Sequence, residues 1–220
     1  MQSSRIRELL NPFLGPQDQR PDTQDLIPRI STYIDIFRRW NTRINLTAIR
    51  GEEEIVTRHF GESLFAARHL FPNGSVYSAP SAVKAFELAD VGSGAGFPGI
   101  PIKLWAPEIA LTLIESNHKK ATFLREVTRV LKLTDVNIQT ARAESVAAGS
   151  FDVVTLRAVE RFESILPVAA GLVVPGGRLA LLISQTQFSN AQSALPLWNW
   201  ADPLPVPKSQ SRVLAIACKP

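Results

Sequence analysis

The amino-acid sequence predicts an α/β protein in which a helical N-terminal extension precedes a doubly wound, mostly parallel sheet. In the first third of the chain, apolar residues recur every three or four positions, as they do on one face of a helix. Farther along, short apolar stretches alternate with amphipathic ones, and a glycine-rich loop follows the first of them. Repeated strand–helix units with right-handed crossovers build a parallel sheet.

Residues 1–70 are expected to be helical. Asp22-Thr23-Gln24 is a helix cap, and the helix after it has an apolar side made of Ile30, Tyr33, Ile34, Phe37, Trp40 and Ile44. A later helix begins at Glu52-Glu53-Glu54, whose acids favour the positive end of the helix dipole. The turn formers over 72–82 end this region. We therefore divide the chain into a helical region, 1–75, and a sheet domain, 83–220.

The sheet domain is expected to alternate between the two kinds of element. Apolar stretches predict strands over 86–91, 109–114, 136–139, 151–156, 178–183 and 213–217. Amphipathic stretches predict helices over 99–105, 117–131, 162–172 and 185–195. Pro175-Gly176-Gly177 is expected to form a turn before the fifth strand.

Composition limits the class of protein. The net charge of +4, from 24 Lys and Arg against 20 Asp and Glu, permits an RNA partner without requiring one. A single cysteine, Cys218, excludes a disulfide framework and is expected to be a small buried residue. No apolar run reaches the ~18–20 residues of a membrane helix, and the N-terminus lacks a signal-peptide pattern. A cytoplasmic protein without membrane contact is expected.

The loop DVGSGAGFPG over 90–99 contains two overlapping glycine motifs. GxGxxG over 94–99 is the fingerprint of nicotinamide and flavin dinucleotides, so an NAD-dependent oxidoreductase is one alternative. Asp90 argues against it, because a carboxylate two residues before Gly92 repels a pyrophosphate. Pro98 and Pro101 also remove N–H donors that a phosphate would use. A ligand with a cationic end fits better. S-adenosylmethionine, which carries a sulfonium and an ammonium group, is such a ligand.

Three further positions are predicted to line the same crevice, because each follows a strand of the parallel sheet. Glu115 ends the second strand and can accept hydrogen bonds from both ribose hydroxyls of an adenosine. Ala143-Glu144 follows the third strand and would lie under the adenine. Arg157 ends the fourth strand and could hold a ligand carboxylate or an RNA phosphate.

Several stretches together resemble the RsmG (GidB) family of bacterial small-subunit ribosomal RNA methyltransferases. They are WNTRINLTAIR (40–50), RHFGESL (58–64), DVGSGAGFPGIPIK (90–103), LIESNHKKATFLREV (113–127), RAE (142–144) and LRAV (156–159). The FPGIP after the glycines is the most specific of these. The chain departs from the family pattern at Glu62, where Asp is common, and at Ser184-Gln185, where a Lys-Gly pair is common.

The resemblance implies a Rossmann-like class I S-adenosylmethionine-dependent methyltransferase fold with a seven-stranded sheet. It also implies methyl transfer to N7 of a guanine in the 530 loop of 16S rRNA, within the small ribosomal subunit, by a monomer. By position, the resemblance implies that Gly92, Phe97, Glu115, Ala143, Glu144 and Arg157 bind the cofactor. The argument from the glycine loop adds Asp90, Gly94 and Gly96 to the expected cofactor-binding residues. Guanine N7 has a free lone pair and no proton to lose. A direct in-line displacement therefore needs no general base, and no catalytic side chain or metal is expected.

RNA contacts are expected from exposed cations near this crevice. The predicted set is Arg39, Arg43, Lys119, Lys120 and Arg157. His59 follows Arg58 in the family-like RHFGESL stretch and is expected to pack inside the protein rather than contact RNA. A non-catalytic RNA- or ribosome-binding module with a vestigial pocket remains the second alternative.

Overall fold

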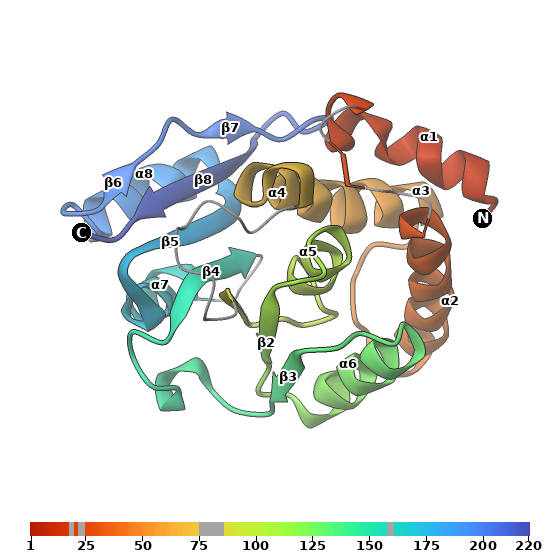
Figure 1. The fold of residues 1–220 in the computed structure, drawn as a ribbon, viewed down its shortest axis with the longest axis horizontal. Helices are drawn as coiled ribbons and strands as arrows, with labels where there is room; N and C mark the ends of the chain where they lie inside the picture. Colours follow the sequence, from red (N-terminus) through yellow and green to blue (C-terminus); the bar gives the residue numbers. More distant parts are fainter. Residues whose placement is uncertain (18–19, 22–24, 75–85, 158–160) are drawn as a thin grey trace.

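The computed structural model describes residues 1–17, 20–21, 25–74, 86–157 and 161–220. The helices are α1 (Ser3–Leu14), α2 (Leu26–Ile44), α3 (Glu52–Glu54), α4 (Glu62–Leu70), α5 (Gly99–Trp105), α6 (His118–Val130), α7 (Phe162–Leu172) and α8 (Gln185–Ala194). The strands are β1 (Glu87–Val91), β2 (Ala110–Ile114), β3 (Val136–Gln139), β4 (Phe151–Arg157), β5 (Val173–Ser184), β6 (Asn199–Trp200), β7 (Leu204–Pro205) and β8 (Arg212–Cys218). Figure 1 shows α1 and α2 at one end of the molecule and β6 at the other.

The strands of the described residues form one sheet in the order β3-β2-β1-β4-β5-β8-β6, with β7 pairing β8. β1 to β5 pair in parallel, whereas β8 is antiparallel to β5. The predicted mostly parallel, doubly wound sheet is therefore confirmed. It has eight strands, one more than the resemblance implies and two more than the apolar stretches predict, because the two-residue strands β6 and β7 both pair with β8. The strand order reverses between β1 and β4, where ligands bind in open α/β sheets.

Each face of the sheet has its own apolar core. Successive side chains of a strand point to opposite faces, and Leu88 of β1 belongs to one core while its neighbour Ala89 belongs to the other. The first core includes α1, α2, α4, α5 and α6, and the second includes α7 and α8. The N-terminal helices thus share a core with the sheet. The division into regions 1–75 and 83–220 stays a prediction, since residues 75–85 lie outside the described part.

The N-terminal helices follow the predicted pattern, with one addition. Ile30, Tyr33, Ile34 and Phe37 of α2 are buried, while Trp40 and Ile44 are half-buried against the same core. A π-helix, η2 (Ile55–Gly61), joins α3 to α4. Gly61 lets it pack on α1, because a Cβ there would come 2.7 Å from the Phe13 ring. The predicted cap at residues 22–24 lies outside the described residues.

Two local expectations differ from the structure. Pro175-Gly176-Gly177 lies inside β5, where the register against β4 shifts, so the strand begins before the expected turn. Cys218 is exposed, and the prediction that it is buried was wrong. It is the last residue of β8, beyond the part of the strand that the helices cover on both faces. Among the described helices, none is long and apolar enough to cross a membrane.

Candidate active site

The glycine loop lies at the carboxyl end of β1, where the strand order reverses. The backbone N–H groups of Gly92 and Ser93 both donate to the carbonyl of Ile114, at 2.9 and 3.1 Å. The N–H of Gly94 donates to Oε2 of Glu115 at 2.8 Å. The ends of β1 and β2 are therefore tied together at the crevice.

Glycine is needed in this loop for two different reasons. Gly96 has φ of 81°, and a Cβ there would come 2.5 Å from the Tyr33 hydroxyl. Gly94 has φ of 56°, but its Cβ would meet only the Gly92 carbonyl oxygen, at 3.8 Å. Gly96 packs against the protein, while the Gly94 backbone faces open space that a ligand can approach.

Asp90 lies beneath the loop rather than on its surface. Its side chain is 0% exposed, and its carboxylate accepts hydrogen bonds from the Thr155 hydroxyl at 2.9 Å and the Gly99 N–H at 3.1 Å. Burial raises the pKa of Asp90 from 3.8 to about 7, although the hydrogen bonds from Thr155 and Gly99 and the charge of Arg157 oppose the shift. The sequence argument placed this carboxylate beside the ligand. In the structure it is one layer below, so any attraction for a cation acts through the loop.

Both carboxylate oxygens of Glu115 accept hydrogen bonds just after β2 ends. Its Oε1 accepts from the N–H of Asn117 at 2.7 Å, and its Oε2 accepts from Gly94. Each carboxylate oxygen has a second lone pair for a further donor. Asn117 in turn caps α6 by accepting from the N–H groups of Lys119 and Lys120. The carboxylate orientation is therefore set by both the loop and the start of α6.

Phe97 points its ring away from the loop and into the N-terminal helices. It lies between two rings, with its centroid 5.4 Å from Tyr33 at an interplanar angle of 9° and 4.9 Å from His59 at 14°. The Tyr33 hydroxyl donates to the carbonyl of Ala95 inside the loop. Side chains from α2 and η2 thus hold the glycine loop. The role of Phe97 as a cofactor contact stays a prediction, as its side chain is buried.

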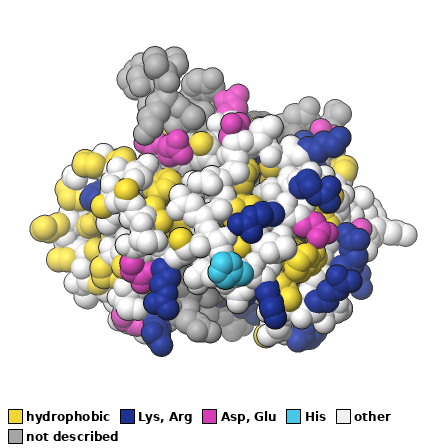
Figure 2. Space-filling model, turned by 90° about the horizontal axis from the view of Figure 1, so that it is seen from below, with side chains coloured by type: hydrophobic (Ala, Val, Ile, Leu, Met, Phe, Trp, Pro, Cys, Tyr) yellow, Lys and Arg dark blue, Asp and Glu magenta, His cyan; other side chains and the backbone are white. Residues whose placement is uncertain are grey.

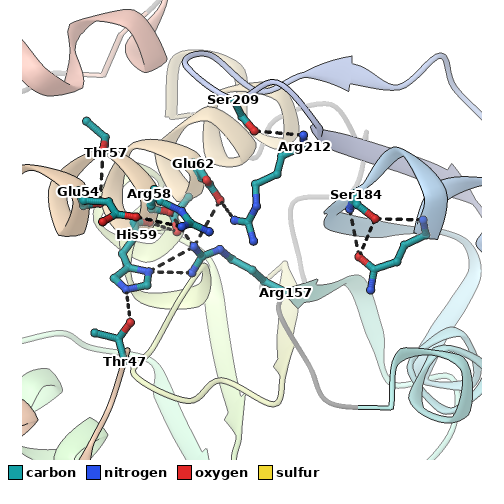
Figure 3. Close-up of polar contacts among 12 residues, drawn as sticks. Thr47, Glu54, Thr57, Arg58, His59, Glu62, Arg157, Ser184, Ser209 and Arg212 are labelled. Atoms are coloured by element: carbon teal, nitrogen blue, oxygen red, sulfur yellow. Dashed lines mark hydrogen bonds and ion pairs between the residues drawn. The ribbon is translucent and has the colours of Figure 1, made fainter. Parts of the chain in front are cut away.

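Arg157 extends from the end of β4 towards η2 and α4, where it joins a buried polar cluster (Figure 3). Its guanidinium donates to the carbonyl of Arg58 at 2.7 Å, to Glu62 at 3.3 Å and to Nδ1 of His59 at 3.2 Å. Arg212 of β8 donates to the same Glu62 carboxylate at 2.5 Å. Burial lowers the pKa of Arg157, while the charge of Glu62 raises it.

His59 is neutral and fully engaged in this cluster. Because an arginine can only donate, Nδ1 is the acceptor, so the Nε2–H donates to the Thr47 hydroxyl at 3.0 Å. Burial, followed by the charge of Arg157, lowers the pKa of His59 to about 3. The expectation that His59 packs inside the protein is confirmed. Nε of Arg157 is buried without a hydrogen-bond partner among the described residues.

The remaining predicted residues lie around this centre. Ala143 is buried in the second core, and Glu144 is exposed beside it in the short 3₁₀ helix η4 (Ala143–Ser145). Of the predicted RNA contacts other than Arg157, Lys120 is half-buried, and the exposed ones are Arg39, Arg43 and Lys119. Figure 2 shows Lys and Arg side chains gathered at the end of the molecule that holds α2 and α6 in Figure 1.

Ser184, where the family pattern commonly has lysine, caps α8. Its hydroxyl accepts from the Gln187 N–H at 3.2 Å, and Gln187 Oε1 accepts from the Ser184 N–H at 3.1 Å. This reciprocal pair is a capping box. The S-x-x-Q spacing could have been found in the sequence. Tyr33 and Thr155, by contrast, have no local signal, because their partners are 62 and 65 residues away.

Comparison with known proteins decides the family. A family model described as GidB, rRNA small subunit methyltransferase G, matches residues 26–200. The chain belongs to the GidB family. Ribosomal RNA small subunit methyltransferase G of Halorhodospira halophila is 37% identical over 196 residues, which cover 88% of each chain. The protein of the same name from Roseiflexus castenholzii is 44% identical over 160 residues, which cover 70% of this chain and 64% of that relative.

Solved structures place this GidB family member in the class I methyltransferase fold. A ribosomal protein L11 methylase from Lactobacillus delbrueckii subsp. bulgaricus aligns with a TM-score of 0.56 and 17% identity, over 74% of this chain and 79% of that one. P. horikoshii TYW2 in complex with MeSAdo aligns with a TM-score of 0.53 and 14% identity, over 61% of this chain and 57% of that one. At such identities the likeness establishes the fold alone. It confirms the predicted fold class.

Proposed function

We propose that this chain transfers the methyl group of S-adenosylmethionine to N7 of a guanine in the 530 loop of 16S rRNA, by in-line displacement without a general base. The observation that carries the proposal is the glycine loop at the sheet's switch point, tied through Gly94 to the carboxylate of Glu115. Membership of the GidB family supports rRNA as the substrate. The 530 loop and N7 rest on the resemblance of the motifs described above.

The residues present fit S-adenosylmethionine, which supplies an electrophilic methyl group. The open side of Gly94 allows close backbone approach, and the free lone pairs of Glu115 suit two ribose hydroxyls. Arg157, at the end of β4, is the proposed partner of the amino-acid carboxylate. Asp90, one layer below, adds negative potential under the loop when ionised. Ala143 and Glu144 are proposed to border the adenine.

Two groups with perturbed pKa values near the loop, Asp90 and His59, are poorly placed to act as bases. Asp90 has a pKa near neutrality but no exposed surface. His59 is a very weak base, and both ring nitrogens already have partners. A guanine N7 acceptor needs no base, so this arrangement is consistent with catalysis by orientation and proximity.

The experiment is to incubate the purified protein with methyl-labelled S-adenosylmethionine and small ribosomal subunits from a strain that lacks this gene. We expect one label per subunit, and mass spectrometry should locate it as 7-methylguanine in the 530 loop. Label at another base would overturn the site assignment. Subunit binding without cofactor uptake would favour a non-catalytic module, and NADH binding would favour an oxidoreductase.

A further inference from the structure

A groove outside the candidate active site runs between the C-terminal half of α6 and β3, the edge strand of the sheet. Its volume is about 610 Å³. Its lining combines three cations with an apolar floor: Arg125, Arg129, Lys132, Leu133, Val136 and Ile138. None of the residues predicted above to bind cofactor or RNA lines it.

The three cations lie on one side of α6 and its end. Arg125 and Arg129 are four residues apart and Lys132 follows three later, the spacing of one helix face. All three are exposed. Arg125 is held by a 2.7 Å hydrogen bond to the Thr140 hydroxyl, in the segment after β3. Arg129 and Lys132 make no side-chain hydrogen bond or ion pair with any residue that the structure describes.

The nearby acids leave this positive charge largely uncompensated. Glu126 of α6 accepts a 2.9 Å hydrogen bond from the Trp40 indole of α2, so it turns towards the neighbouring helix. Asp135 precedes β3. Burial lowers the pKa of Lys103, and the charge of Asp135 partly opposes that shift. The ammonium of Lys103 is buried between the carbonyls of Pro107 and Ile109. Neither Glu126 nor Asp135 forms an ion pair with Arg129 or Lys132 among the residues that the structure describes.

The floor of the groove adds contacts of another kind. Leu133, Val136 and Ile138 are half-buried and pack against the first core. They present an apolar strip beside the cations, where a sugar or base can lie while phosphates contact the charged groups. An acidic peptide would satisfy the cations too. A nucleic acid fits better, because this family acts on rRNA and Lys119 and Lys120 lie at the other end of α6.

We propose that the groove between α6 and β3 binds the phosphodiester backbone of the RNA substrate at a second site, away from the reaction centre. The inference rests on the proposed function for the identity of the RNA. α6 has 13 residues, a length of about 20 Å at 1.5 Å per residue. RNA that follows this helix would contact Lys119 and Lys120 near Glu115 and reach Arg129 and Lys132 at the far end.

The test compares two double variants that each remove two positive charges. R129Q/K132Q removes an exposed helical arginine and a lysine at φ of 50° from the groove. R7Q/K208Q removes an exposed arginine from α1 and an exposed lysine at φ of 60° elsewhere. The pairs are matched in charge and backbone conformation. Affinity for naked 16S rRNA is measured by filter binding at several salt concentrations, and affinity for intact subunits and labelled methyl transfer are measured in parallel.

We expect R129Q/K132Q to bind naked rRNA on the order of 10-fold more weakly at low salt. The slope of log affinity against log salt should fall by about 1.5, since each lost phosphate contact removes about 0.7–0.9. Affinity for S-adenosylmethionine should not change, and R7Q/K208Q should match the wild type. Equal rRNA binding by both double variants would overturn the inference. So would weaker binding to intact subunits alone, which would indicate a ribosomal protein as the partner. A wild type that binds rRNA through the groove but transfers no methyl would overturn the proposed function instead.

Discussion

At the scale of single residues, Asp90 connects the glycine loop to the sheet. Its carboxylate accepts from Gly99, the last residue of the loop, and from Thr155 of the neighbouring strand β4. A Cβ at Gly99 would come 2.8 Å from the same carboxylate oxygen, so this contact leaves no room for a side chain. The hydrogen bonds of Asp90 therefore hold the loop in place on the sheet. Any effect of its charge on ligand binding is additional.

We expect Asp90 to make stability depend on pH. Its pKa is about 7 in the folded chain against an ordinary 3.8, so between these values the folded state keeps a proton that the unfolded state has lost. This contribution is present at low pH and is lost as the pH rises towards 7. From pH 5 to pH 8, the wild type should lose about 2–3 kcal/mol of unfolding free energy relative to Asp90→Asn. Urea titrations measure the difference. His59 titrates in both proteins and cancels, so a constant difference would contradict the prediction.

A second prediction concerns Glu115. Glu115→Ala removes the acceptor for Gly94 and the proposed partner of the ribose, so S-adenosylmethionine should bind about 1–3 kcal/mol more weakly. Isothermal titration calorimetry measures this loss. Glu108→Ala, which removes an exposed acid before β2, is the control and should bind as the wild type does. Unchanged affinity in Glu115→Ala would remove this residue from the site.

At the scale of elements, the π-helix η2 brings the N-terminal region into the candidate site. It carries Arg58 and His59, and Glu62 follows at the start of α4, so three polar groups on this segment meet Arg157. π-Helical turns are frequent at functional sites. The sequence predicted a helix here, but helical periodicity cannot distinguish a π-turn from an α-turn over so few residues.

We expect the buried Arg157–Glu62 ion pair to contribute far more to the free energy of unfolding than the exposed Arg58–Glu54 pair. Glu62→Gln leaves the guanidinium of Arg157 buried without a counter-charge and should reduce unfolding free energy by about 3 kcal/mol. Glu54→Gln breaks an exposed pair with Arg58 and should cost less than about 0.5 kcal/mol. Urea unfolding of both variants at one pH provides the comparison. Equal losses would show that the pair is not effectively buried.

At the scale of the whole molecule, the N-terminal helices and the sheet form one packing unit. Residues of α1, α2 and α4 share the first core with Leu88 of β1 and Leu113 of β2. The Tyr33–Phe97–His59 stack and the Arg157 cluster also join the two regions. The position of the glycine loop is thereby linked to that of α2, which carries Arg39 and Arg43.

This shared core predicts a single cooperative unfolding transition. Far-UV circular dichroism and tryptophan fluorescence should give coincident urea curves, since neither region can lose its core alone. The Phe13→Ala variant should shift both curves equally, although Phe13 lies in α1, because its ring packs in the common core. Separate midpoints for the two probes would favour independent domains.

Most elements could be predicted because their signals are local. Asn117 at the start of α6 and the apolar stretch 151–156 show their structure within a few residues. The two-residue strands β6 and β7 could not be found in this way, because both exist only by pairing with β8. Cys218 was assigned to the interior from its type, but its burial depended on where the strand ends.

The sequence by itself determined the alternating sheet, the glycine loop, the acid at the end of β2 and the family, since each depends on residues close together in the chain. Only the tertiary structure decided that Asp90 lies beneath the loop, that Arg157 is paired with Glu62, and that Phe97 stacks between two rings from the N-terminal helices. The physical reason is sequence distance. Arg157 and Glu62 are 95 residues apart, and their desolvation and pairing exist only once the helices have packed on the sheet.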